Sequence, residues 1–169
     1  MGQYYRIVNI DKHEWMSPAD FGSGLKLLEF ASPIYPEMTT SALVLLLADG
    51  NNRGGGDLRS DDPIIGSWAH DRIVVVGDYA DPHNGISYYQ DVNDHHYRNV
   101  SVDIFKAMLE DGYIMDEVIA RSVKKLENHM DYWIPEVLIR LARAKDPILN
   151  SVNPKIIDKI AEVHLWDDK

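Results

Sequence analysis

The chain of 169 residues contains no cysteine. This absence excludes disulfide bonds, thiolate metal sites and a cysteine nucleophile, and it favours a cytoplasmic location. Long hydrophobic runs are also missing, because the longest apolar stretch, residues 42–48, is far shorter than the roughly 20 residues that a membrane-spanning helix needs. The N-terminus lacks the basic and apolar segments of a secretory signal. We therefore expect a soluble, cytoplasmic protein that has no membrane partner.

Positive charge is scarce. The 17 lysines and arginines are outnumbered by 27 acidic residues, which gives a formal net charge of −10. Such a chain is a poor binder of the nucleic-acid phosphate backbone. The excess of acid is explained most simply by solubility, with cation binding and an acidic surface that imitates nucleic acid as alternatives. The length predicts a single domain over 1–169 that can bury a core without covalent staples.

The pattern of apolar residues predicts an α+β fold. Alternation predicts a strand near 4–10, and the continuous β-branched run in 71–77 predicts a central strand buried on both faces. Residues 25–31 favour a short strand, and 42–48 favour a helix buried nearly all round. The segments 50–66 and 78–97 are expected to be long irregular loops.

The last third of the chain changes character. Amphipathic stripes predict helices at 102–109, 115–126, 133–144 and 154–165. Because strands come first and helices last, we expect a small sheet and long Gly/Asp-rich loops within 1–100, packed by helices from 101–169.

Residues 49–94 hold seven of the 11 glycines and nine aspartates, and they hold no glutamate. Glycines allow close approach of a ligand, and loops on a rigid scaffold are where sites usually lie. The triple glycine can offer backbone N–H groups to an anion between two arginines, although it lacks the Lys-Ser/Thr ending of a P-loop. We expect a ligand site built from both glycine loops and the tyrosines of the first strand. The predicted ligand-binding residues are Tyr4, Tyr5, Arg53, Gly54, Gly55, Gly56, Arg59, Trp68, Arg72, Asp78, Tyr79 and Asp81.

A metal site is the alternative interpretation of the second loop. The segment 77–81 resembles the GDxxD element of the calcineurin-like metallophosphoesterases, where an earlier Asp-x-His and a later Asn-His help to hold two metals. Residues 11–13 supply the first pair, and Asn128 with His129 supply the second without the family's preceding glycine. The resemblance implies divalent metal ligands at Asp11, His13, Asp78, Asp81 and His83, and it requires Asp11 and Asp78 to lie at neighbouring strand ends.

A broader resemblance covers roughly the first half of the chain. Segments 1–5, 8–12, 21–29 and 71–81 together resemble a family of small bacterial and phage proteins. The resemblance implies a shared fold and brings no mechanism with it, although it makes capture of a host nucleotide or inhibition of a host protein natural hypotheses. We therefore expect a binding protein for a small polar or nucleotide-like ligand. A metal-dependent phosphoesterase and an acidic protein-interaction module are the alternatives, and oligomerisation is left open.

Overall fold

The computed structural model describes residues 2–32 and 38–165. The strands form a four-stranded mixed sheet in the order β3-β1-β2-β4. The strands are β1 (Tyr5–Asn9), β2 (Glu14–Met16), β3 (Ile73–Gly77) and β4 (Arg98–Asn99). Strand β1 pairs antiparallel with both β2 and β3, whereas β2 and β4 are parallel.

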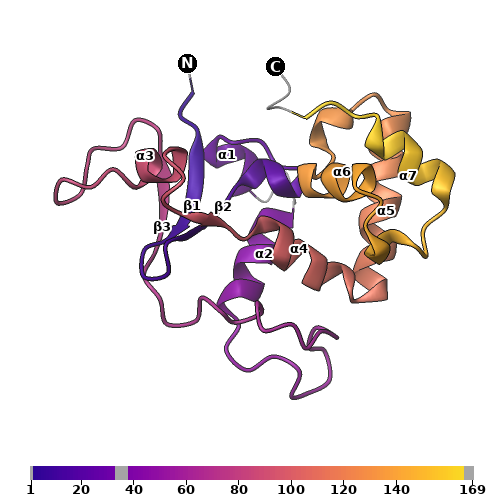
Figure 1. Ribbon diagram of the computed structural model, residues 1–169, viewed down its shortest axis with the longest axis horizontal. Coiled ribbons are helices and arrows are strands. Elements are labelled where there is room, and N and C mark those ends of the chain that lie inside the picture. The colour runs from indigo at the N-terminus through magenta and orange to yellow at the C-terminus, as the bar shows by residue number, and fades with distance from the viewer. Residues whose placement is uncertain (1, 33–37, 166–169) are drawn as a thin grey trace.

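The other elements are helices, and they follow the last strand or lie between the strands in the chain. The α-helices are α1 (Leu27–Phe30), α2 (Met38–Leu47), α3 (Tyr88–Asn93), α4 (Ser101–Leu109), α5 (Gly112–Glu127), α6 (Glu136–Arg143) and α7 (Pro154–Ala161). Three short 3-10 helices are η1 (Pro18–Phe21), η2 (Asp131–Trp133) and η3 (Pro147–Leu149). In Figure 1 the sheet and α3 lie at one end, α2 and α4 lie in the middle, and α5, α6 and α7 form the other end.

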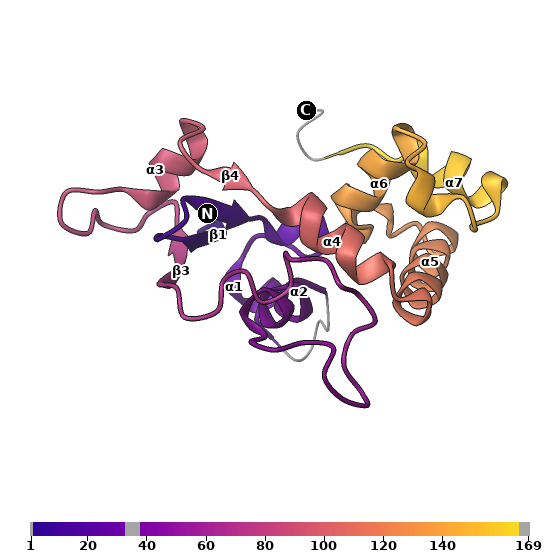
Figure 2. The ribbon, with the colours of Figure 1, turned by 60° about the horizontal axis from the view of Figure 1, so that its bottom comes forward.

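Two hydrophobic cores cover opposite faces of the sheet. Successive side chains of a strand point to opposite faces, so Ile7 joins the large core shared with the helices whereas Val8 joins a smaller one. The smaller core contains Val76 and is covered by α3 through Val92. Figure 2 shows α3 on one side of the sheet and the helical half on the other. The architecture is therefore α+β, as the order of elements predicts.

The prediction that residues 71–77 form a central strand is wrong. Strand β3 lies at the edge of the sheet, and its Val75 is 42% exposed. The continuous β-branched run has another cause: Val76 packs in the smaller core, while Ile73 packs against the large one. An edge strand covered on both faces gives the same apolar pattern as a central strand.

The prediction of a strand within residues 25–31 is also wrong. Residues Leu27–Phe30 form a helical turn in which Lys26 N–H donates to the Glu29 carboxylate at 3.1 Å. Only Phe30 of this turn is buried, and its ring meets Tyr5 edge-on at 6.3 Å. One inward side chain in four residues is compatible with either element, so local capping decides the conformation.

Helix α2 begins earlier than predicted and is not buried all round, because Val44 is 64% exposed. The sequence patterns did not predict β2, α3 or β4. The four C-terminal helices are present with ends shifted by a few residues. No helix in the described ranges combines the length and apolar character needed to cross a membrane.

Candidate functional site

The two glycine loops do not come together. The loop after β3 extends beyond the sheet, whereas the loop of residues 50–60 lies below α2 and α4, and both views separate them (Figures 1 and 2). The composite ligand site expected from the sequence is therefore not assembled. Its residues are distributed over several parts of the molecule.

The triple glycine stands free of other groups. Gly54, Gly55 and Gly56 are exposed, and an added Cβ at any of them would meet nothing within 4 Å. Asp57 caps this turn, because its carboxylate accepts from the N–H groups of Arg53 and Gly54 at 2.7 and 2.9 Å. A carboxylate of the chain therefore occupies the N–H group of Gly54, one of the three glycine donors that were expected to hold an anion.

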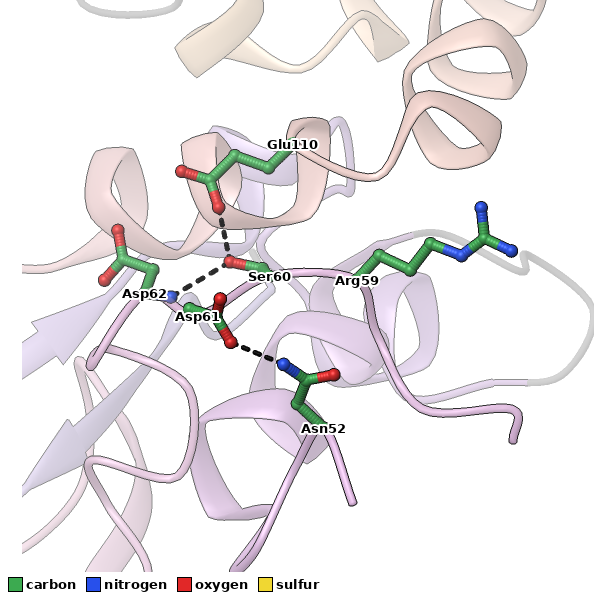
Figure 3. A pocket seen from close by; sticks show the side chains of 6 residues that line it. All are labelled: Asn52, Arg59, Ser60, Asp61, Asp62 and Glu110. Atoms are coloured by element: carbon green, nitrogen blue, oxygen red, sulfur yellow. Dashed lines mark hydrogen bonds between the residues drawn. The ribbon is translucent and has the colours of Figure 1, made fainter. Parts of the chain in front are cut away.

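Arg59 lines a shallow cavity of about 570 Å³ together with three acidic residues (Figure 3). The acids are engaged locally: Glu110 accepts from the Ser60 hydroxyl, and Asp61 accepts from the amide of Asn52. Figure 3 shows the Arg59 guanidinium extending away from them. An acidic lining of this kind repels an anionic ligand.

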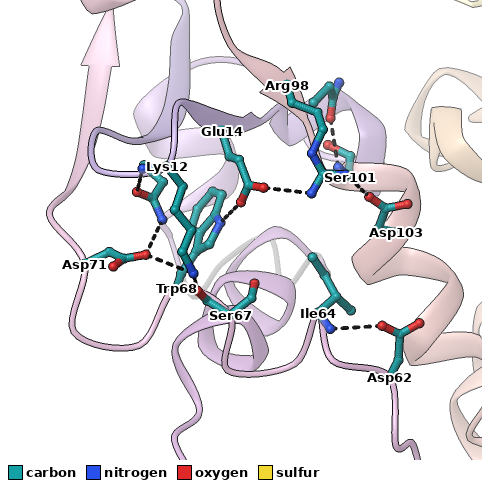
Figure 4. Close-up of polar contacts among 12 residues, drawn as sticks. Lys12, Glu14, Asp62, Ile64, Ser67, Trp68, Asp71, Arg98, Ser101 and Asp103 are labelled. Atoms are coloured by element: carbon teal, nitrogen blue, oxygen red, sulfur yellow. Dashed lines mark hydrogen bonds and ion pairs between the residues drawn. The ribbon is translucent and has the colours of Figure 1, made fainter.

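Trp68 belongs to the core and not to a ligand surface. Its side chain is 0% exposed, and its indole N–H donates to Glu14 at 2.7 Å (Figure 4). The other oxygen of Glu14 accepts from Arg98 at 2.7 Å, which links β2 to β4. Trp68 therefore holds the sheet against α2 and is not available for stacking on a ligand.

The predicted residues at the start of β1 and the end of β3 form an exposed turn. Tyr4 donates its N–H to the Asp78 carboxylate at 3.0 Å, and the Asp78 N–H donates back to the Tyr4 carbonyl at 3.0 Å. Tyr79 and Asp81 follow on the surface, and Tyr79 is 62% exposed. Asp78 acts here as the closing residue of the ladder between β1 and β3.

Antiparallel pairing also separates the proposed metal ligands. The register of β1 and β3 places Asp11 beside Arg72 at the start of β3, whereas Asp78 lies at the other end of that strand. Six residues of extended chain separate these ends by about 20 Å. Within the described ranges, no group of three or more His, Cys, Asp or Glu side chains is placed to hold a metal ion. The geometry does not support the two-metal interpretation.

One cavity does gather several predicted residues. It has a volume of about 600 Å³ and lies between the β1–β2 turn, the start of β3, the turn at 83–86 and helix α3. We call it the histidine pocket. Its lining residues are Ile10, His13, Arg72, His83, Asn84, Ile86, Tyr88, Asp91, His96 and Tyr97.

Local sequence explains how this pocket is built. Asn84 and Gly85 both have positive φ, 52° and 80°, and His83 and Ile86 exchange backbone hydrogen bonds of 2.9 and 3.0 Å across them. This is the two-residue hairpin turn that Asn-Gly favours. On the opposite wall, the Ser87 hydroxyl caps α3 by accepting from the Gln90 N–H at 3.4 Å.

Buried Asn9 holds together two of the segments that line the pocket. Its side chain donates to Asp71 at 2.8 Å and accepts from the Lys12 N–H at 3.0 Å, so it joins the β1–β2 turn to the start of β3. His13 then adopts a positive φ of 53°, and its ring meets Tyr97 edge-on at 5.0 Å. These contacts set the direction in which His13 and Arg72 face the cavity.

The polar groups of the pocket are good donors. The hydrogen bond to Asp11 raises the pKa of Arg72 above its ordinary value, so the guanidinium keeps its charge. Burial raises the pKa of Tyr97, with a further contribution from Asp91, so the phenol keeps its proton. Asp91 lies 3.9 Å from His96 Nδ1 and places one acceptor among these donors.

Of the ten residues that line this pocket, the sequence predicted three as site residues. It identified Arg72 as a ligand-binding residue and His13 and His83 as metal ligands, but it left Tyr88, Asp91, His96 and Tyr97 unassigned. Two signals were available: the Asn84-Gly85 dipeptide predicts a tight hairpin, and Ser87 predicts a helix start. Together they would have placed α3 over the sheet.

Comparison of the chain with models of protein families, with curated proteins and with solved structures finds no match. The case for a function therefore depends on the chemistry of the pocket.

Proposed function

We propose that the protein binds a small, ring-bearing anion, such as a nucleoside monophosphate, in the histidine pocket. The observation that carries the proposal is the composition of one cavity: a charged arginine, three imidazoles and two phenol rings face the same space of about 600 Å³. Pockets for small molecules commonly enclose roughly 300–1,000 Å³, and a few placed polar groups give them specificity.

Arg72 is the anchor for the anionic group. Its Nε and Nη2 atoms face Asp11 at 2.7 and 2.6 Å, which fixes the plane of the guanidinium. Its Nη1 atom has no hydrogen bond or ion pair within the described ranges, so this edge can donate to a phosphate oxygen. The imidazole of His13 or His83 can supply a second donor.

The aromatic walls suit the ring of the ligand. Tyr88 is half-buried at the start of α3, and its ring can stack on a base, which typically stabilises binding by about 1–3 kcal/mol. The Asp91 carboxylate can accept from a sugar hydroxyl or an exocyclic amine. Sequestration of such a ligand also agrees with the resemblance to small bacterial and phage proteins.

Isothermal titration calorimetry with adenosine monophosphate, adenosine and inorganic phosphate tests the proposal. We expect the nucleotide to bind more tightly than either fragment, because only the nucleotide reaches both Arg72 and Tyr88. Equal affinity for nucleotide and nucleoside would show that the arginine has no part in recognition. Absence of any binding by a panel of purine and pyrimidine monophosphates would overturn the proposal.

Two arginine variants locate the site. Arg72→Met is expected to weaken nucleotide binding by about tenfold or more, which is the effect of losing one charge-assisted hydrogen bond. Arg53→Met is the matched control, because Arg53 lies on the exposed triple-glycine loop. If Arg53→Met abolishes binding and Arg72→Met does not, the glycine loop is the site and the histidine pocket is not.

A further inference from the structure

A second cavity lies on the same side of the sheet, with Tyr89 of α3 in its wall. Its volume is about 270 Å³, and its walls include Arg6, Trp15, Asp20, Tyr89, Glu136 and Arg140. We call it the Arg6 pocket. It shares no lining residue with the histidine pocket. Helix α3 separates the two, with Tyr88 lining the histidine pocket and Tyr89 lining the Arg6 pocket.

The guanidinium of Arg6 contacts two aromatic rings. Its guanidinium carbon lies 4.6 Å from the centroid of Trp15 and 4.6 Å from that of Tyr89. Both rings therefore contact the guanidinium, and these cation–π contacts orient the group without using any of its N–H donors. Within the described ranges, the Arg6 side chain makes no hydrogen bond and no ion pair. Its planar edge is thus a ready donor set for a carboxylate.

The opposite wall is acidic. Asp20 is 2% exposed and Glu136 is 4% exposed, and Arg140 bridges them at 2.6 and 2.9 Å. The remaining oxygen of Asp20 accepts from Asn99 at 3.1 Å. Each oxygen of Asp20 has one such bond, so either can accept a second hydrogen bond from a ligand.

The two walls do not neutralise each other directly. No ion pair within 4.0 Å joins Arg6 to Asp20 or Glu136, although all of them line the same small space. A simple carboxylate would be attracted by Arg6 and repelled by the acidic wall. A simple ammonium ion would be attracted by the acidic wall and repelled by Arg6. A molecule with both charges at a short separation satisfies both walls.

We propose that the Arg6 pocket binds a small zwitterion of the α-amino acid class, with its carboxylate on Arg6 and its ammonium on Asp20. The cavity is smaller than most pockets for drug-sized ligands, which suits a molecule of this size. Tyr5 and Leu25 also line it and offer an apolar surface to the side chain of the ligand. This proposal does not depend on the histidine pocket.

Calorimetric titration of the wild-type chain with the twenty common α-amino acids tests the proposal first. For any amino acid that binds, its amide and its deaminated acid are titrated next. We expect both analogues to bind at least about tenfold more weakly, since each lacks one of the two charges. Equal binding of the amino acid and either analogue would overturn the proposal, as would no binding by any member of the panel.

Arg6→Met then locates the site, because methionine keeps an unbranched side chain against Trp15 and Tyr89 and removes the guanidinium N–H donors. The expected result is loss of amino acid binding by about tenfold or more, with only the small fall in melting temperature that follows from losing two cation–π contacts. Arg53→Met is the matched control, because Arg53 is exposed and lines neither pocket, and it should bind the amino acid like the wild type. Indole NMR shifts of Trp15 in the wild-type chain report occupancy independently of any variant. An Arg6→Met variant that binds normally would overturn the assignment.

Discussion

Arg72 donates its backbone N–H to Asp11 Oδ2 and its side-chain Nε–H to Asp11 Oδ1, both at 2.7 Å. The pair ties the turn after β1 to the start of β3, since the two strands run antiparallel. It also explains why the Asp-x-His of this chain does not make a metal site. The carboxylate is paired with a guanidinium, and Asp78, which the resemblance requires beside Asp11, lies at the other end of β3.

The first prediction concerns the titration of Asp11. The side-chain hydrogen bond from Arg72, and then its backbone hydrogen bond, hold the pKa of Asp11 below its ordinary value. Arg72→Met should therefore raise this pKa, as measured by carbon NMR of the carboxyl group. Because the folded pKa is the lower one, the pair stabilises the fold above the ordinary carboxyl pKa, and this contribution is lost as the pH falls through the lowered value. Arg53→Met is the control and should leave the Asp11 titration unchanged. A pKa that does not move in Arg72→Met would contradict the pairing.

The second prediction concerns Trp68. Replacement by phenylalanine removes the indole donor to Glu14 and part of a fully buried volume. We expect the free energy of unfolding to fall by about 1–3 kcal/mol, measured by urea denaturation. Trp133→Phe is the matched control, because Trp133 is only half-buried and its indole N–H has no partner in the described chain. Equal loss in the two variants would contradict a stabilising role for the buried indole of Trp68 and its bond to Glu14.

The third prediction separates two glycines that the sequence does not distinguish. Gly66 has a φ of +75°, and an added Cβ would lie 2.5 Å from the carbonyl oxygen of Ala48. Gly66→Ala should therefore destabilise the fold by about 2 kcal/mol or more, measured by thermal or urea unfolding. Gly54→Ala meets nothing within 4 Å and should be neutral or slightly stabilising. A destabilised Gly54→Ala would show that the triple-glycine loop has a constraint beyond its backbone.

The fold class followed from the order of patterns along the chain, because amphipathic stripes in the last third are long enough to decide the element type. The position of β3 did not follow. The apolar run of residues 73–76 predicts a central strand. In the structure this strand lies at the edge of the sheet, and its side chains pack into two separate cores. Strand neighbours depend on long-range pairing, which an apolar run does not specify.

The candidate site was predictable in part, and for a similar reason. Arg72, His13 and His83 stood out by residue type, but the partners that complete their pocket come from α3 and from Tyr97. Arg6 and Trp15 gave no signal, because their stacking depends on the register of β1 with β2 and on the packing of Tyr89. The composition of the glycine loop predicted a site there instead, although Asp57 accepts from the N–H groups of Arg53 and Gly54 in that loop.

The last prediction concerns Ser67, whose hydroxyl oxygen is buried without a hydrogen-bond partner among the described residues (Figure 4). A buried hydroxyl without a partner costs free energy, so Ser67→Ala should raise the free energy of unfolding by about 1 kcal/mol. The backbone carbonyl of residue 67, which accepts from Lys12, is unaffected by this change.

Ser23→Ala is the matched control, because the Ser23 hydroxyl is buried and bonds the Thr39 hydroxyl at 2.7 Å. It should lower the free energy of unfolding by about 1 kcal/mol, so the two serine variants should differ in sign. Urea denaturation of both variants beside the wild type measures this difference. If Ser67→Ala is as destabilising as Ser23→Ala, the Ser67 hydroxyl is satisfied in solution, and a buried water bound to it is then the physical explanation.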